Sequence, residues 1–441
     1  MRSQPTSGAG ACRRLDDAVC VQRVTFDSSG EVLAGDMYLP GPSTGGPRPA
    51  VVVAGAWATV KEQMAAGYAR ELAARGYIAM AFDYRSWGRS GGQPRSMEDP
   101  AAKSADIVAA AEFLARHAAV DFDAIGGLGI CAGSSYLVAA ATVSPLIKSL
   151  VLVAPALPTR ADVRQNLGGE QNMAALIAAA EQASAEYERS GQQRLVPAVP
   201  PADDDRAARE SYFSDPDRGL IPEWDNTFNP ASWSRWIPFD VHALAHRLAQ
   251  PTCVVHSDVA VNPDSVRAFL SKVSGPVDQL SLDGLSQFDF YDQPHAMAAA
   301  TGAAVAHFSR TLRPAGATAL FDHLAASEVV TIGTITTRGH VINTLVGAVV
   351  VDDAGYIRSQ HGAKAKWYRR ATRVPHGFVI HDAARFPVGF SRVTDAETIH
   401  RVDRATYRKY GGKVRSLLLR PLLWRTRHHV LKITPQGCPT D

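Results

Sequence analysis

Short apolar runs alternate with longer segments of helical length and composition through residues 21–312. The runs that predict strands cover residues 21–26, 32–39, 50–54, 77–82, 125–130, 150–153, 252–256 and 278–282. The segments that predict helices cover residues 63–74, 101–117, 134–142, 263–273 and 295–312. This alternation predicts an α/β fold, in which a mostly parallel sheet carries helices on both faces. Ligand sites in such sheets lie beyond the carboxyl ends of the strands.

The alternation breaks between residues 156 and 241. This segment combines a polar helical stretch with a proline cluster and an aromatic block. We expect a helical lid here, inserted at about residues 157–240. Tyr212, Trp224 and Trp233 would either line an apolar substrate pocket or only pack the lid onto the body.

A second pattern begins after residues 313–320, which we interpret as a linker. The runs that predict strands there cover residues 329–337, 341–351, 356–359, 377–380, 388–393 and 429–433, with a helix at 396–410. They predict a small β-barrel with peripheral helices over residues 321–437. Residues 1–20 contain turn-formers and charges without the apolar stretch of a signal peptide, so we expect a disordered lead-in.

Composition narrows the class of protein. The 441 residues are 46% hydrophobic and 20% charged, and no run approaches the ~20 apolar residues of a membrane span. The net charge is only +3, yet the chain is basic from Phe321 onward and acidic before it. The basic part lacks any nucleic-acid recognition motif, so we expect a small-molecule substrate and no nucleic-acid or membrane partner.

The cysteines indicate the compartment. They are five in number, widely spread, and show no metal-ligand spacing. An odd, sparse set of this kind is typical of a reducing compartment, so we expect a cytoplasmic protein without a metal site.

The stretch Gly129-Ile130-Cys131-Ala132-Gly133 follows a predicted strand and opens a predicted helix. A strand, a sharp Gly-x-nucleophile-x-Gly turn and a helix form the nucleophile elbow of α/β-hydrolases, here with cysteine in place of serine. A helix N-terminus stabilises negative charge, and the thiolate is the reactive form of cysteine. We therefore interpret Cys131 as a nucleophile, against the alternative of a small buried cysteine in a glycine-rich turn.

Several ordered motifs resemble the dienelactone-hydrolase-like branch of the α/β-hydrolases. The resemblance covers about residues 21–312 and rests on Val-Lys-Glu-Gln at 60–63, Phe-Asp-Tyr-Arg at 82–85, the elbow at 129–133 and Phe-Asp-Phe-Tyr-Asp at 288–292. It implies an α/β-hydrolase fold and a Cys-His-acid triad acting on an ester, lactone, thioester or related carbonyl of an apolar small molecule.

Carried over by position, the resemblance makes Cys131 the nucleophile and Asp258 the acid, with oxyanion donors at Ala132 and near Trp57. The histidine is missing, because Gln287 stands where the family has it. Glutamine does not titrate near neutral pH and cannot act as a general base. His256, which ends a predicted strand, and His295, in the last predicted helix of this part, are the candidates that would replace it.

The loss of histidine changes the expected chemistry. A thiol can attack a carbonyl without a strong base, whereas water needs one to release the acyl group. Such a site suits either slow hydrolysis or a non-hydrolytic reaction, such as that of a cyclase, lyase or acyl transferase in a biosynthetic pathway. Gln287 would then hydrogen-bond the substrate or the nucleophile.

The C-terminal part resembles a small bacterial domain family of unassigned function that belongs with the FMN-binding split barrels. The match spans about residues 325–435 and includes Tyr-Ile-Arg-Ser at 356–359 and Trp-Tyr-Arg at 367–369. It implies a flavin or deazaflavin whose phosphate Arg358, Ser359 and Arg369 would bind, which would allow an oxidoreductase. The alternative is a cofactor-free barrel whose basic face serves docking or a homodimer.

Overall fold

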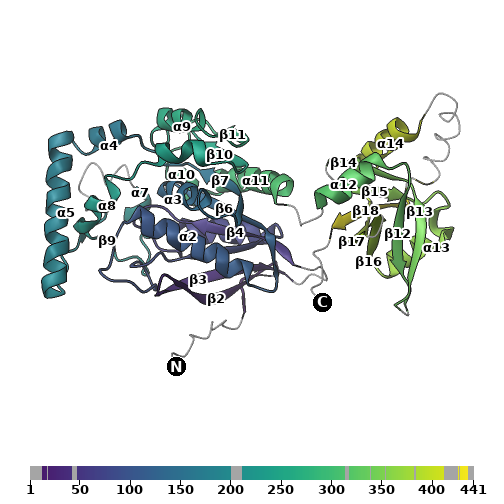
Figure 1. The fold of residues 1–441 in the computed structure, drawn as a ribbon, viewed down its shortest axis with the longest axis horizontal. Helices are drawn as coiled ribbons and strands as arrows, with labels where there is room; N and C mark the ends of the chain where they lie inside the picture. Colours follow the sequence, from purple (N-terminus) through teal and green to yellow (C-terminus); the bar gives the residue numbers. More distant parts are fainter. Residues whose placement is uncertain are drawn as a thin grey trace. The chain divides into compact units, whose positions relative to one another are not determined.

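The computed structural model describes residues 12–16, 18–41, 47–199, 211–312, 317–337, 339–352, 354–381, 384–411, 426 and 428–435. The chain divides into two compact units (Figure 1), of which the first ends at Leu312 and the second begins at Arg313. The mostly parallel sheet predicted for the first unit is present, and each unit has its own buried core.

A nine-stranded sheet in the order β1-β2-β3-β5-β4-β6-β7-β10-β11 forms the first unit. Its strands are β1 (Arg13–Arg14), β2 (Val19–Ser28), β3 (Glu31–Pro40), β4 (Arg48–Ala54), β5 (Ile78–Phe82), β6 (Val120–Ile130), β7 (Ile147–Val153), β10 (Thr252–His256) and β11 (Val277–Ser281). Strands β1, β2, β3 and β5 pair antiparallel, and the pairs from β5 through β4 to β11 are parallel.

Alternation along the central strands divides the core into two layers. In β4, Val52 belongs to one buried cluster, whereas Val51 and Val53 belong to the other. Successive side chains of a strand point to opposite faces, so a strand buried on both faces reads as a continuous apolar run. The helices on these faces are α1 (Met64–Ala74), α2 (Pro100–Ala115), α3 (Ala132–Ala141), α9 (Pro263–Leu270), α10 (Asp289–Asp292) and α11 (Pro294–Thr311).

An insertion separates β7 from β10. Its elements are α4 (Arg160–Asn166), α5 (Glu170–Ser190), β8 (Val196–Pro197), α7 (Ser211–Ser214), β9 (Thr227–Phe228), η1 (Pro230–Ser232), α8 (Trp233–Trp236) and η2 (Val241–Arg247). Helix α5 runs along the edge of the unit in Figure 1, and only its Met173 and Ala180 are buried. The helical insertion lies where the sequence pattern breaks.

The second unit is an antiparallel sheet that curls into a half-barrel, in the order β13-β12-β16-β17-β18-β15-β14. Its elements are α12 (Ala317–Ala326), β12 (Val330–Ile335), β13 (Val341–Val346), β14 (Ala348–Val351), β15 (Ala354–Arg358), η3 (Gly362–Lys364), α13 (Lys366–Arg373), β16 (His376–His381), β17 (Ala384–Arg392), α14 (Ala396–Tyr410) and β18 (Val430–Pro435). Leu324, Ile332, Val379 and Ile433 are among its buried core residues.

Three expectations from the sequence need correction. The linker expected over 313–320 is shorter, because α12 begins at Ala317. The apolar run 341–351 forms two strands, β13 and β14, at opposite edges of the sheet. The lead-in expected to be disordered over 1–20 includes β1, which pairs with β2, while residues 1–11 lie outside the described part.

Cys12 and Cys20 are joined by a disulfide, with Cα atoms 6.0 Å apart. Disulfides are not favoured in a reducing compartment. This bond therefore does not support the cytoplasmic location expected from the cysteine pattern, which stays a prediction. Cys131 and Cys253 are free thiols.

Candidate active site

Cys131 occupies a sharp turn between the end of β6 and the start of α3. Its backbone has φ 52° and ψ −122°, outside the usual regions for a residue with a side chain. The backbone is pinned on both sides, because the Cys131 N–H donates to Val153 O at 3.1 Å and its carbonyl accepts from the Ala156 N–H at 3.0 Å. The elbow expected from the sequence is therefore present.

The flanking glycines are required by close backbone approach. A Cβ at Gly133 would lie 2.3 Å from the carbonyl oxygens of Ala54 and Gly55. A Cβ at Gly129 would lie 2.7 Å from the Cα of Ser134. The elbow thus fits only because neither residue has a side chain.

Gly133→Ala is expected to lower the free energy of unfolding by about 1–3 kcal/mol, because the clashing atoms belong to the backbone and cannot turn aside. The matched control is Gly302→Ala in α11, where nothing lies within 4 Å of the added Cβ. This control should stabilise the helix by about 0.5–1 kcal/mol. Urea unfolding of both variants checks the pair, and equal effects would contradict the account.

Three groups hydrogen-bond the Cys131 sulfur: the hydroxyl of Tyr291, the backbone N–H of Ala132 and the amide of Gln287. All three favour the thiolate, but burial raises the pKa of the thiol above its ordinary value and outweighs them. The helix N-terminus was expected to favour ionisation. Desolvation opposes the ionisation that the helix N-terminus favours.

Tyr291 is a contact that the sequence analysis missed. It lies in α10, is buried, and packs against Tyr212 with ring centroids 5.1 Å apart. Burial and the neighbouring thiol raise the pKa of Tyr291 well above its usual range, so the hydroxyl acts as a donor. Its place in the Phe-Asp-Phe-Tyr-Asp motif was visible, but its contact with the elbow was not.

The rate of Cys131 alkylation by iodoacetamide should rise roughly tenfold per pH unit and still be rising at pH 9, because a raised pKa keeps the thiolate fraction small. Tyr291→Phe removes a donor to the thiolate, so the pKa should rise further and the rate at each pH should fall. The control is Tyr77→Phe, a buried tyrosine beside Phe308. Peptide mapping follows Cys131. A rate that levels off below pH 8 would be contrary to the assignment.

Gln287 is held at both ends of its amide. Its Nε2 donates to Ala154 O at 2.7 Å, and its Oε1 accepts from the Val261 N–H at 3.1 Å. Only 5% of the residue is exposed. The position that carries histidine in the resembling family therefore contributes a fixed, non-titrating contact with the thiol.

The other candidates for the triad, Asp258, His256 and His295, are not among the hydrogen-bond partners of the Cys131 thiol. Asp258 is exposed and accepts from the Gly284 N–H at 2.9 Å and the Ser257 hydroxyl at 3.2 Å, which lowers its pKa. His256 is buried at the end of β10, where burial lowers its pKa. His295 is exposed on the first turn of α11. No histidine of the described residues is among the hydrogen-bond partners of Cys131.

The loop after β4 faces a buried ion pair. The Ala58 N–H donates to Glu98 Oε1 at 2.7 Å, and the same oxygen accepts from Lys103 Nζ. The second oxygen of Glu98 accepts from the Tyr136 hydroxyl at 2.8 Å. The Ala58 N–H is therefore occupied, whereas the N–H of the neighbouring Trp57, the expected oxyanion donor, makes no hydrogen bond within the described residues.

Aromatic rings enclose the ammonium of Lys103. Its Nζ lies 4.6 Å from the ring centroid of Tyr84, 5.0 Å from that of Trp87 and 5.5 Å from that of Tyr136. Glu98 and Lys103 are almost completely buried. This cage supports both the Ala58 loop and, through Tyr136, helix α3.

The later half of the insertion is tied to the body. Trp224 donates to Ala58 O at 2.7 Å, and Arg218 forms an ion pair with Asp292 at 2.6 Å. Tyr212 is buried against Tyr291, and Trp233 packs against Phe228 at 5.0 Å. Tyr212 and Trp224 therefore pack the insertion onto the body, Trp233 packs within the insertion, and Trp224 also lines a cavity of about 230 Å³.

A smaller cavity of about 50 Å³ lies beside the elbow. Its lining is largely apolar and consists of Ala132, Ser135, Tyr136, Ala156, Pro158, Val163, Trp236, Phe239 and Val241. The insertion thus contributes the aromatic residues Trp236 and Phe239 to the cavity beside the elbow, rather than Tyr212, Trp224 or Trp233.

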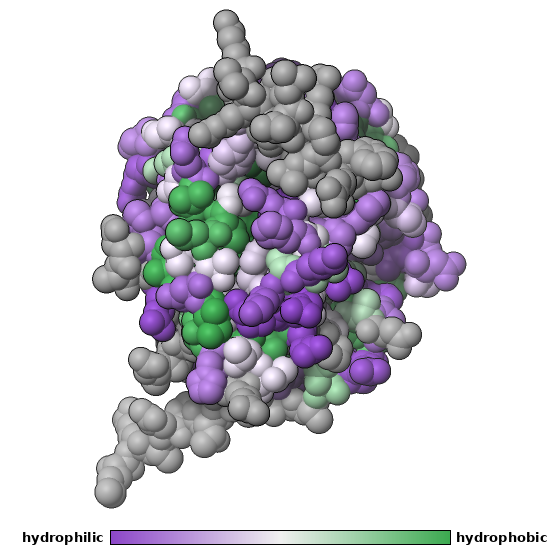
Figure 2. All heavy atoms as spheres, turned by 90° about the vertical axis from the view of Figure 1, so that its right-hand side faces the viewer, coloured by the Kyte–Doolittle hydropathy of each residue, from purple (hydrophilic) through white to green (hydrophobic). Residues whose placement is uncertain are grey.

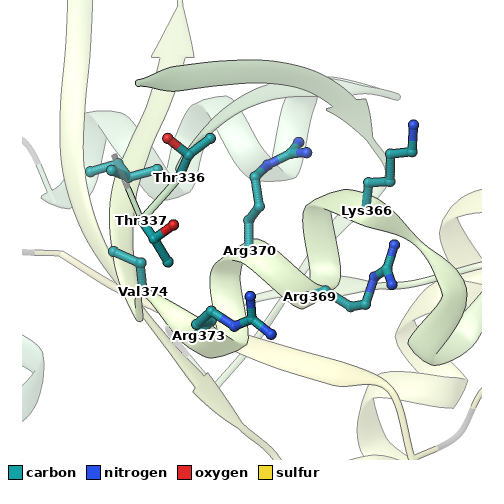
Figure 3. Close-up of a pocket in the computed structure, with 8 residues that line it drawn as sticks. Thr336, Thr337, Lys366, Arg369, Arg370, Arg373 and Val374 are labelled. Atoms are coloured by element: carbon teal, nitrogen blue, oxygen red, sulfur yellow. The ribbon is translucent and has the colours of Figure 1, made fainter. Parts of the chain in front are cut away.

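The phosphate candidates of the second unit do not lie together. Arg358 pairs with Asp403, and the Ser359 hydroxyl donates to Gly362 O at 2.7 Å within the fold. Arg369 instead lines a separate pocket on α13 (Figure 3). The phosphate site expected from the sequence was therefore wrong to include Arg358 and Ser359, because both side chains bind other groups of the protein.

No group of three or more His, Cys, Asp or Glu side chains in the described part of the chain could hold a metal ion. Over the same residues, no helix has both the length and the apolar character needed to cross a bilayer.

The parallel sheet, the elbow and the helices on both faces define the first unit as an α/β-hydrolase. A family model described as X-Pro dipeptidyl-peptidase (S15 family) matches residues 29–269, more than half of the chain. The chain therefore belongs to this family. A second family model, described as an uncharacterized protein conserved in bacteria (DUF2255), matches residues 321–433.

Curated relatives match the first unit. Uncharacterized protein PA2218 of Pseudomonas aeruginosa is 28% identical over 293 residues, which cover 62% of this chain and 76% of the relative. Uncharacterized protein YcjY of Escherichia coli is 28% identical over 275 residues, 60% of this chain and 89% of the relative. Thiohydrolase aneE of Aspergillus aculeatus is 31% identical over 135 residues, 31% of this chain and 41% of the relative.

Solved structures show the same fold. The crystal structure of PA2218 from Pseudomonas aeruginosa has a TM-score of 0.60 at 23% identity and covers 68% of this chain and 96% of its own. The α/β-hydrolase GrgF from Penicillium sp. sh18 has a TM-score of 0.56 at 17% identity, with 66% and 98% covered.

Proposed function

We propose that the first unit cleaves an ester, lactone, thioester or related carbonyl compound of an apolar small molecule by nucleophilic attack of Cys131. The observation that carries this proposal is the thiol itself, which sits on a strained elbow at the start of α3 and contacts the Ala132 N–H. The dienelactone-hydrolase-like branch, with its cysteine nucleophile, remains part of this proposal.

The carbonyl oxygen would be stabilised by two backbone donors. The Ala132 N–H already points at the sulfur, and the Trp57 N–H lies on the loop that Glu98 holds through Ala58. Such a pair contributes about 10²–10³ in rate for each donor. The insertion would act as the lid, with Trp236 and Phe239 at the acyl group.

The proton balance favours good leaving groups. As the sulfur–carbon bond forms and the bond to the leaving group breaks, the thiol proton must pass to the departing oxygen or sulfur, because neither Gln287 nor Tyr291 titrates near neutral pH. Amide cleavage needs an acid to protonate a poor leaving amine. We therefore favour esters and thioesters over peptides, despite the peptidase name of the family. The name of the thiohydrolase relative supports a thioester.

The step that releases the acyl group from Cys131 distinguishes hydrolysis from a non-hydrolytic reaction. Water needs a base for attack, and the thiol's hydrogen-bonding neighbours Gln287 and Tyr291 provide none. An acyl group that carries its own nucleophile would instead be released by cyclisation. An acyl group that a second substrate accepts would be released by transfer. A cyclase, lyase or acyl transferase on this fold is therefore the second candidate, and the contact of Gln287 with the thiol is the observation that favours it.

Burst kinetics with p-nitrophenyl acetate test the proposal. We expect one equivalent of p-nitrophenolate per chain in a fast phase, followed by slow release. Cys131→Ala should lose the fast phase, whereas Cys253→Ala should keep it, since Cys253 is buried and burial raises its pKa to about 11. A burst that survives Cys131→Ala would refute the assignment. Fast sustained turnover that depends on Cys131 would favour hydrolysis over transfer.

We also propose that a flavin or deazaflavin could occupy the second unit, as the split-barrel resemblance implies. The basic side chains along α13 fit the phosphate end of such a cofactor. A bound flavin would supply redox chemistry and would make the purified protein yellow. Visible absorbance, or fluorescence quenching on titration with riboflavin phosphate, tests this idea.

A further inference from the structure

The second unit contains a cavity of about 360 Å³ between α13 and the end of β12. Four of the residues that line it are cationic: Lys366, Arg369, Arg370 and Arg373. Thr336 and Thr337 face them from the strand end, as Figure 3 shows. The volume lies in the usual range for a small-molecule site.

The spacing of the four cations places them together on one side of α13. Residues three and four apart on a helix lie side by side on its surface. The opposite side is buried, since Tyr368 is 3% exposed and Ala371 is fully buried. The helix therefore presents a row of like charges to the cavity, an arrangement that destabilises the helix unless an anion joins it.

Some arginines of this unit form ion pairs with carboxylates. Arg358 pairs with Asp403, and Arg401 pairs with Asp352. Within the described residues, no carboxylate lies within ion-pair distance of the four cations of α13. The positive charge that faces the cavity is thus uncompensated over that part of the chain.

Arg370 is the most strongly positioned of the four. Its Nε donates to Thr334 Oγ1 at 2.8 Å, and Thr334 is fully buried. Burial lowers the pKa of Arg370, with no acidic neighbour acting against it. Within the described residues, no second hydrogen bond engages the Arg370 guanidinium, so its other N–H groups can bind an anion in the cavity, and Figure 3 shows Arg370 extending from the helix toward the strand end.

We propose that this cavity binds the phosphate group of a phosphorylated small molecule. Guanidinium groups bind phosphate oxygens through paired, charge-assisted hydrogen bonds, and threonine hydroxyls add neutral donors. Figure 2 shows the side of the molecule on which α13 and β13 lie, where hydrophilic side chains lie next to apolar ones. The four cations line one pocket of about 360 Å³, a size that fits a small ligand better than a nucleic acid.

Calorimetric titration of the full chain with inorganic pyrophosphate tests the proposal, with inorganic phosphate in parallel. We expect saturable binding that weakens as salt rises. Arg370→Gln should weaken binding by about tenfold or more, since each charged hydrogen bond contributes that much. The matched control is Arg404→Gln, which removes the same charge from an exposed position on α14.

Arg373→Gln repeats the test at an exposed residue, in case loss of the Thr334 contact unfolds the Arg370 variant. Absence of pyrophosphate binding at low salt would overturn the proposal. An equal loss in Arg404→Gln would also overturn it, because net charge rather than the cavity would then be responsible. The inference rests on the same side chains of α13 as the flavin proposal and is independent of Cys131. Pyrophosphate binding without quenching of riboflavin phosphate fluorescence would support the phosphate site and exclude the flavin.

Discussion

Gln287→His is expected to raise the steady-state hydrolysis of an activated ester by about 10²–10⁴, the usual contribution of a positioned general base. The side chain at 287 already contacts the Cys131 sulfur, and its backbone lies in the loop before α10. A histidine there would accept the thiol proton during acylation and activate water during deacylation. Acylation alone should not limit the wild-type enzyme, so the gain should appear mainly in the slow phase after the burst.

Gln287→Asn is the matched control, because it keeps an amide and adds no base. We expect it to leave the slow phase as slow as in the wild type. A pH profile of the histidine variant should show activity rising through the pKa of imidazole, a feature that the wild type lacks. Turnover of the histidine variant equal to that of Gln287→Asn would contradict the inference that a missing base limits the reaction.

Lys103→Met is expected to lower the free energy of unfolding by about 3–5 kcal/mol, since it leaves Glu98 as an uncompensated buried charge. The two side chains are 1% and 0% exposed. The methionine is close in size to the lysine stem, so the loss would come from the charge rather than from a cavity. The same change should impair acylation, because Glu98 positions Ala58 beside Trp57.

Lys272→Met, at an exposed position, serves as the control and should change stability by no more than about 0.5 kcal/mol. The double variant Glu98→Gln with Lys103→Met should recover part of the lost stability, because no buried charge remains. Urea denaturation measures all three variants. A single Lys103→Met variant as stable as the wild type would show that the ion pair does not support the loop.

The fold of the first unit could be predicted from its sequence because its central strands are buried on both faces. Val51, Val52 and Val53 read as one apolar run although they point alternately into two core layers. The elbow could also be predicted, because close backbone contacts require glycine at 129 and 133, and the spacing of these glycines around Cys131 forms a motif in the sequence.

The second unit was less predictable in its strand pairing and in helices α12 and α13, whereas the helix expected at 396–410 is present as α14. Helix α13 exposes most of its cationic residues and buries only Tyr368 and Ala371, too few to show a helical period. The apolar run 341–351 gave no sign that its two halves pair with different strands, β12 and β15. Pairing partners depend on the rest of the sheet.

The candidate site could be predicted only in part, because several of its contacts join distant segments of the chain. Cys131 and Gln287 stand at positions that motifs mark, whereas Tyr291, Glu98 and Lys103 act through contacts between distant segments. The hydrogen bond from Ala58 to Glu98 joins residues 40 positions apart, so no local sequence pattern predicts it. The raised pKa of the Cys131 thiol likewise depends on packing, which a helix-terminus argument does not include.

Intact-mass spectrometry after mixing the protein with p-nitrophenyl acetate tests the central claim most directly. The account predicts one added acetyl group, mapped to Cys131, that persists after the reagent is removed and is absent from Cys131→Ala. Cys253→Ala should acquire the same adduct. An adduct that persists in Cys131→Ala, or no adduct and no product from the wild type, would contradict nucleophilic catalysis at this elbow.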